Sequence, residues 1–172
     1  KRVISFKECD REYLNIFIMN NIIKLCLDIN GNNIIKYFIR NMKNENYIRL
    51  VIEKFENNAN ILCMSQYGNE IIRQAIEVFG YNYCRKIVRT ILNNIVDYSI
   101  GKHSSNLIIF LLTDFKNKNM VNFIECLNNI FMDENNYKEM IRNKFSLYGI
   151  EKAFVLIDEI NPEYFNNNNQ GI

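Results

Sequence analysis

The 172-residue sequence is 48% hydrophobic and 23% charged, which is the balance of a folded soluble protein. One proline and six glycines permit long helices and are too few for an all-β fold with many tight turns. The formal net charge of +2 does not indicate nucleic-acid binding by itself, so only basic side chains gathered on one face could supply phosphate contacts.

The residues that usually carry chemistry form no recognisable catalytic or metal-binding motif. The five cysteines include no Cys-x-x-Cys pair and there is one histidine, so we expect buried free thiols in a reducing compartment and no metal site. Glycine-rich phosphate-binding motifs, paired carboxylates and Cys–His motifs are missing from the sequence. We therefore expect no enzyme, no cofactor and no small-molecule substrate. Without an apolar run of about 18 residues or a signal peptide, no membrane association is expected either.

Residues 1–21 fit the end of a partial helical unit. Arg2-Val3-Ile4 resembles the apolar pair of a second helix, and the segment from Tyr13 to Phe17 has the apolar spacing of a third helix. Because this unit is incomplete, we interpret the chain as part of a longer repeat array.

Residues 22–57 form the first complete unit, which is predicted to contain three helices. A short apolar helix from Ile23 to Asp28 ends at a turn that contains Gly31. The second helix begins at an asparagine, a residue type that caps free backbone N–H groups. A third helix is predicted from Tyr47 to Phe55, where apolar residues have helical spacing.

The unit recurs with a nearly constant period. Gly68 follows Gly31 by 37 residues, and Ile71-Ile72 aligns with Ile34-Ile35, which defines a second unit over residues 58–93. Its third helix is predicted over residues 83–92. One such unit cannot bury its apolar face alone, but stacked neighbours can.

Two further units follow with serine in place of the turn glycine. In the third unit, residues 94–134, Ser104 lies 36 residues after Gly68, and a third helix is predicted over residues 121–131. In the fourth, residues 135–165, Ser146 lies 42 residues after Ser104, and the extra residues are assigned to a polar loop at 133–136. Residues 166–172 are interpreted as a frayed tail. The sequence thus predicts one all-α domain over residues 1–172, an α-α superhelix of about four three-helix repeats with partial repeats at its ends.

The segment Gly68-Asn69-Glu70-Ile71-Ile72-Arg73 and its counterpart from Gly31 resemble the core motif of Pumilio (PUF) repeats. The third unit, around Ser105-Asn106-Leu107-Ile108, resembles the penultimate repeat of that family. The long loop before the fourth unit lies where the family often has one before its last repeat. The resemblance implies the C-terminal half of an eight-repeat RNA-binding superhelix.

In that family the second helices line the concave face, and each repeat reads one RNA base. The resemblance implies that the first and fifth residues after the turn glycine contact the base edge, while the second stacks on the base. Residues at i and i+4 of a helix do share one face. The RNA-binding residues implied here are Asn32, Asn33 and Lys36; Asn69, Glu70 and Arg73; Ser105, Asn106 and Ile109; and Leu147, Tyr148 and Glu151.

Several of these residue types depart from the base-reading pairs of the family. Uracil is usually read by Asn with Gln, whereas the fifth positions here hold Lys36 and Arg73, which only donate hydrogen bonds. Ile109 has no hydrogen-bonding side-chain atom, and Glu70 has no ring for stacking. Tyr148 keeps the stacking ring. We therefore expect weak sequence specificity, with Lys36 and Arg73 contacting phosphate or a guanine edge.

Two functions remain open from the sequence. The first is RNA binding in post-transcriptional regulation or on the ribosome, with an mRNA 3′ untranslated region or ribosomal RNA as ligand and ribosomal or regulatory proteins as partners. Such a protein is expected in the cytoplasm or nucleolus. The alternative is a protein-interaction scaffold that kept the solenoid and lost RNA binding, because repeat arrays also bind peptides and fold does not fix function.

Overall fold

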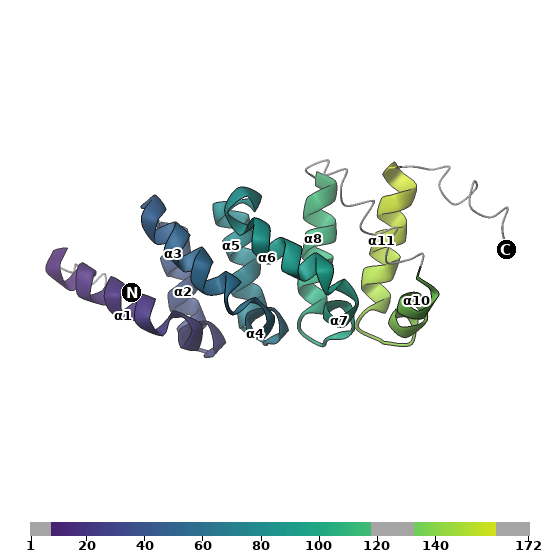
Figure 1. Ribbon diagram of the computed structural model, residues 1–172, viewed down its shortest axis with the longest axis horizontal. Coiled ribbons are helices and arrows are strands. Elements are labelled where there is room, and N and C mark those ends of the chain that lie inside the picture. The colour runs from purple at the N-terminus through teal and green to yellow at the C-terminus, as the bar shows by residue number, and fades with distance from the viewer. Residues whose placement is uncertain (1–7, 118–132, 161–172) are drawn as a thin grey trace. The chain divides into compact units, whose positions relative to one another are not determined.

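The computed structural model describes residues 8–117 and 133–160 (Figure 1). Every regular element in these ranges is an α-helix, as the sequence predicts. The chain divides into two compact units, Lys1–Ile87 and Val88–Ile172. From here on these are called the first and second units, and the shorter sequence units are called repeats. The division falls within helix α6 (Tyr81–Asn93).

The first unit consists of five helices and the first part of α6. The five are α1 (Glu8–Leu27), α2 (Gly31–Asn41), α3 (Glu45–Glu56), α4 (Ala59–Met64) and α5 (Gly68–Phe79). Helix α2 packs between α1 and α5, and α4 packs on α5. The apolar core of this unit includes Ile35, Ile39, Phe55, Leu62 and Ile71, all fully buried. The helices predicted over residues 47–55 and 83–92 are confirmed by α3 and α6.

Helix α1 is longer than the sequence pattern predicts. The predicted short helix from Ile23 to Asp28 is the last part of one continuous 20-residue helix, which contains neither glycine nor proline. Asn21 Nδ2 donates to the carbonyl of Phe17 at 2.9 Å without ending the helix. Asn58 makes the same i to i−4 bond at 2.9 Å, yet it lies at the break between α3 and α4. The prediction of a separate short helix from Ile23 to Asp28 is therefore wrong, because no residue before Ile23 stops α1 from propagating.

A close backbone contact joins each second helix of the first unit to the helix before it, α2 to the end of α1 and α5 to α4. A Cβ atom on Gly31 would lie 2.6 Å from the carbonyl oxygen of Leu25 and 2.8 Å from its Cα. At Gly68 the corresponding distances to Leu62 are 2.5 and 2.8 Å. Glycine is needed at these two turns because the neighbouring backbone occupies the space of a side chain.

In the second unit, a serine stands at the corresponding junction between the short helix and the second helix. It contains α7 (Ile95–Ile100), α8 (Ser105–Asn117), α10 (Glu134–Ile141) and α11 (Leu147–Ile160), and α8 packs on both α7 and α11. Ser104 Oγ donates to the carbonyl of Tyr98 at 2.7 Å, and Ser146 Oγ donates to the carbonyl of Met140. Both carbonyls lie six residues earlier, as Leu25 does from Gly31. The alignment of these serines with the turn glycines is thereby supported by the structure.

The polar run 133–136, predicted as a loop, instead begins α10. Asp133 Oδ1 accepts hydrogen bonds from the backbone N–H groups of Asn135 at 2.9 Å and Asn136 at 3.1 Å. A side-chain acceptor at this position satisfies the free N–H groups of a first helical turn. The polar residues therefore form a cap and a first turn. The predicted helix over 121–131, the segment Arg2-Val3-Ile4 and the tail 166–172 lie outside the described residues, and the repeat boundaries stay predictions.

Three cysteines are free and buried, as the sequence predicts: Cys26, Cys63 and Cys84. Burial raises the pKa of the Cys26 and Cys63 thiols from 9.0 to about 12, and burial together with the charge of Glu56 raises the pKa of the Cys84 thiol from 9.0 to about 12. The side chains of Cys9 and Cys126 are not among those described. At neutral pH the three buried thiols are therefore protonated and shielded.

We expect these three thiols to resist modification in the folded protein. A variant with Cys9 and Cys126 replaced by serine should not react with a thiol reagent at pH 8 until urea is added. Between pH 9 and about 12 the unfolded thiols lose their protons and the folded ones keep them. The free energy of unfolding should therefore fall by about 1.4 kcal/mol per pH unit for each thiol. Fast labelling without urea, or constant stability above pH 9, would contradict this expectation.

Candidate nucleic-acid interface

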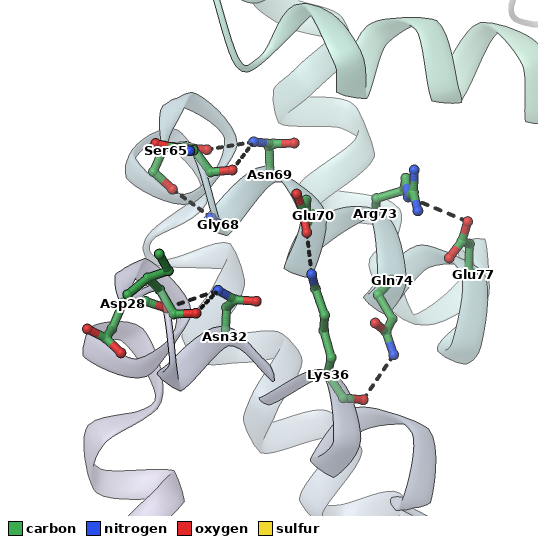
Figure 2. A network of polar contacts seen from close by, with 12 residues as sticks. Asp28, Asn32, Lys36, Ser65, Gly68, Asn69, Glu70, Arg73, Gln74 and Glu77 are labelled. Carbon is green, nitrogen blue, oxygen red and sulfur yellow. Dashed lines mark hydrogen bonds and ion pairs between the residues drawn. The ribbon is translucent and has the colours of Figure 1, made fainter. Parts of the chain in front are cut away.

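The residues that the Pumilio resemblance implies for the first unit lie on the first two turns of α2 and α5, which are neighbours (Figure 2). Gln74, which no sequence pattern singled out, links these two helices. Its buried side chain donates from Nε2 to the backbone carbonyl of Lys36 at 2.9 Å. We call the side of the second helices that carries the implied residues the second-helix face of each unit.

The asparagines at the first position are used by the fold itself. Asn32 Nδ2 donates to the backbone carbonyls of Asp28 at 3.1 Å and Ile29 at 2.9 Å, and its residue is buried. Asn69 Nδ2 donates in the same way to the carbonyls of Ser65 at 2.7 Å and Gln66 at 2.9 Å. An amide group has two N–H donors, and both are occupied here. Each side chain therefore offers only the acceptor Oδ1 to a ligand.

The predicted role of these asparagines as caps for helix N–H groups is wrong. Instead, the backbone N–H of Gly31 donates to Asp28 Oδ1 at 2.6 Å, and the backbone N–H of Gly68 donates to Ser65 Oγ at 2.8 Å. The side chains of Asn32 and Asn69 donate to backbone carbonyls of the preceding turn, so they satisfy free carbonyl groups and not free N–H groups. The turn itself brings a capping side chain three residues ahead of the glycine, which the residue types at the helix start do not reveal.

The two predicted cations of the first unit are both paired with carboxylates (Figure 2). Lys36 Nζ forms an ion pair with Glu70 of the neighbouring helix, and its side chain is 22% exposed. Arg73 Nε lies 3.7 Å from Glu77 Oε1 on the same helix. Glu77 was missed, although its i+4 spacing from Arg73 is typical of helix ion pairs. The face therefore alternates cations and carboxylates instead of forming a basic strip.

The second unit presents a different face. Its residues lie on the first turns of α8 and α11, which pack together. Ser105 is buried and Ile109 half-buried, whereas Asn106 and Glu151 are exposed. Leu147 and Tyr148 are also exposed, and the ring of Tyr148, at 55% exposure, is accessible for stacking. This face thus combines an aromatic ring with apolar side chains, neutral polar side chains and the carboxylate of Glu151.

The described residues offer no sign of metal chemistry or of a bilayer span. Over 8–117 and 133–160, no three His, Cys, Asp or Glu side chains gather in a way that could hold a metal ion. In the same ranges no helix has both the length and the apolar character to cross a membrane.

Second helices that each begin after an equivalent turn, at α2, α5, α8 and α11, define an α-helical repeat protein. No protein-family model matches the sequence, and no curated protein matches it. Among solved structures, the chain is similar to a Puf4 mutant bound to a Cox17 RNA 3′ UTR recognition sequence, with a TM-score of 0.73 and 14% identity over 91% of this chain and 50% of that one. It is similar to PUF-8 in complex with PBE-RNA, with a TM-score of 0.72 and 11% identity over 96% and 48% of the two chains.

A third similar structure is the RNA-binding domain of yeast Puf5p bound to SMX2 RNA, with a TM-score of 0.63 and 16% identity over 88% of this chain and 46% of that one. These matches confirm the predicted fold, an all-α superhelix of Pumilio-like repeats. The chain spans about half the length of these solved PUF domains.

Proposed function

We propose that the protein binds single-stranded RNA on the second-helix faces of its repeats. The observation that carries this proposal is the fold, which is shared with PUF domains solved with RNA. The side-by-side placement of the implied residues on α2 and α5, and on α8 and α11, supports it within each unit.

Recognition by backbone and shape is the mode that these side chains favour. The amide donors of Asn32 and Asn69 are occupied, so the donor-and-acceptor pairing that reads uracil is incomplete. Lys36 and Arg73 suit phosphate oxygens, and Tyr148 suits a base ring. Weak sequence specificity fits a role in post-transcriptional control or on the ribosome, with an mRNA 3′ untranslated region or ribosomal RNA as ligand. We place such a role in the cytoplasm or nucleolus.

Neutralising Lys36 and Arg73 tests this proposal. The double variant Lys36→Gln/Arg73→Gln should bind mixed-sequence single-stranded RNA more weakly, by a similar factor for every sequence. The slope of log affinity against log salt should become shallower by about 0.7 for each lost phosphate contact. Fluorescence anisotropy titrations over a series of KCl concentrations measure both quantities.

The matched control changes two lysines outside the second helices. Lys54 lies on α3 and Lys86 on α6, so Lys54→Gln/Lys86→Gln alters the net charge equally but leaves the second-helix face intact. Equal effects of the two double variants would point to nonspecific charge attraction and contradict the proposed face. Absence of RNA binding by the unaltered protein at low salt would overturn the proposal.

One observation favours the alternative, a protein-interaction scaffold. The two implied RNA-contacting cations, Lys36 and Arg73, already have carboxylate partners, which lowers the attraction of this face for phosphate. A scaffold would bind no RNA and would retain its protein partner in the Lys36→Gln/Arg73→Gln variant. Binding measurements with RNA and with a partner recovered by crosslinking separate the two functions.

A further inference from the structure

Glu70 is the one acidic residue among the four second-position residues, the others being Asn33, Asn106 and Tyr148. In this position the Pumilio resemblance implies a residue that stacks on a base. The carboxylate instead contacts Lys36, a fifth-position residue of the preceding repeat. The ion pair therefore links two residues that are both assigned to the RNA-binding face.

The geometry around the pair keeps these groups together. Gln74, one turn along α5 from Glu70, bonds to the backbone carbonyl of Lys36 and fixes the register of α2 against α5. The Lys36 side chain is only 22% exposed, whereas the Glu70 side chain is 49% exposed. The contact between the ammonium and the carboxylate is itself exposed, so a phosphate that binds the Lys36 ammonium competes with Glu70 for it.

A carboxylate on a lysine ammonium makes the same kind of charged hydrogen bond that a phosphate oxygen makes. An RNA phosphate must therefore displace Glu70 from Lys36 or accept a like charge beside it. Glu70 also has no ring on which a base could stack. Both effects lower the affinity of this face for RNA.

We infer that Glu70 is an internal competitor for phosphate that sets the RNA affinity of the first unit. This inference rests on the proposed function, since it takes RNA as the ligand of Lys36. It names an affinity-determining residue: while Glu70 stays paired, the face disfavours a phosphate at Lys36, and releasing Lys36 restores a phosphate site.

The test is the near-isosteric variant Glu70→Gln, titrated with mixed-sequence single-stranded RNA over a series of KCl concentrations. We expect RNA affinity at low salt to rise about two- to fivefold, the range of an exposed ion pair. The salt slope should steepen by about 0.7, because one more cation becomes available to phosphate. The double variant Lys36→Gln/Glu70→Gln should lose the steeper slope.

Glu56→Gln is the matched control. Glu56 of α3 pairs with Lys86 of α6 at 3.2 Å, so this variant removes the same charge and breaks a comparable pair away from the second helices. It should leave the salt slope unchanged. Thermal unfolding measurements on each variant check whether the fold is retained.

The outcomes separate the inference from the proposed function. If Lys36→Gln weakens RNA binding but Glu70→Gln changes neither affinity nor slope, the inference is wrong and the function stands. If Glu70→Gln binds RNA more tightly and with a steeper salt slope than the unaltered protein, while Glu56→Gln does not, the inference is supported and the function stands. If no variant binds RNA, both fall, because RNA is then not the ligand of Lys36.

Discussion

Replacing Gly31 with alanine is expected to lower the free energy of unfolding by about 1–3 kcal/mol, the usual range for overpacking a tight contact. The added Cβ would lie 2.6 Å from the carbonyl oxygen of Leu25 and 2.8 Å from its Cα. Both are backbone atoms, so no side chain can rotate away. Helix α2 would have to move from α1, and the core between them would open.

The matched control is Gly149→Ala in α11, where an added Cβ meets nothing within 4 Å. Alanine there should be neutral or stabilising by up to about 1 kcal/mol, because it favours helix more than glycine does. Urea unfolding followed by circular dichroism measures both variants. Equal stability of the Gly31→Ala variant and the unaltered protein would show that the contact is not as tight as described.

Replacing Asn32 with aspartate is expected to lower the free energy of unfolding of the first unit by about 3 kcal/mol. The buried carboxylate would face two backbone carbonyl oxygens that had lost their hydrogen-bond donors. The amide donates to two backbone carbonyls, of Asp28 and Ile29, and a carboxylate can donate to neither. The favourable field at a helix N-terminus would offset this by about 1 kcal/mol or less. Urea unfolding measures the loss.

The adjacent residue supplies the control, because Asn33 is exposed and makes no bond of this kind to the turn. Asn33→Asp introduces the same charge one position along the same helix and should change stability by less than about 0.5 kcal/mol. RNA binding by the Asn32→Asp variant provides a second measurement. If Asn32→Asp altered base preference and left stability unchanged, the asparagine would be a base reader and not part of the turn.

The periodic positions of the sequence were sufficient to predict the repeat. Glycine or serine at Gly31, Gly68, Ser104 and Ser146, each followed by apolar pairs or runs, predicted where α2, α5, α8 and α11 begin, within about a residue. This works because helix periodicity and close backbone approach are local constraints that each repeat satisfies in the same way. The continuous helix α1 was missed because asparagine lies at the break between α3 and α4, as Asn58, but is tolerated inside α1, as Asn21.

The properties of the candidate interface depended on residues far apart in the sequence. The pairing of Lys36 with Glu70 spans 34 positions, and the bond from Gln74 to the Lys36 carbonyl spans 38. No local pattern determines these contacts, because they exist only once α2 and α5 are packed together. Likewise, the residue type of Asn69 suits a cap, a base contact or a bond to the turn, and only its burial and its two carbonyl partners select the last.

The sequence alone therefore determined that this protein is an all-α repeat array, since apolar spacing and turn residues specify helices and their period. Only the tertiary structure decided which polar groups of the second helices are left for a ligand. The physical reason is that a side chain's hydrogen-bonding capacity is divided between its fold and its ligand, and that division is fixed by neighbours that packing brings within reach.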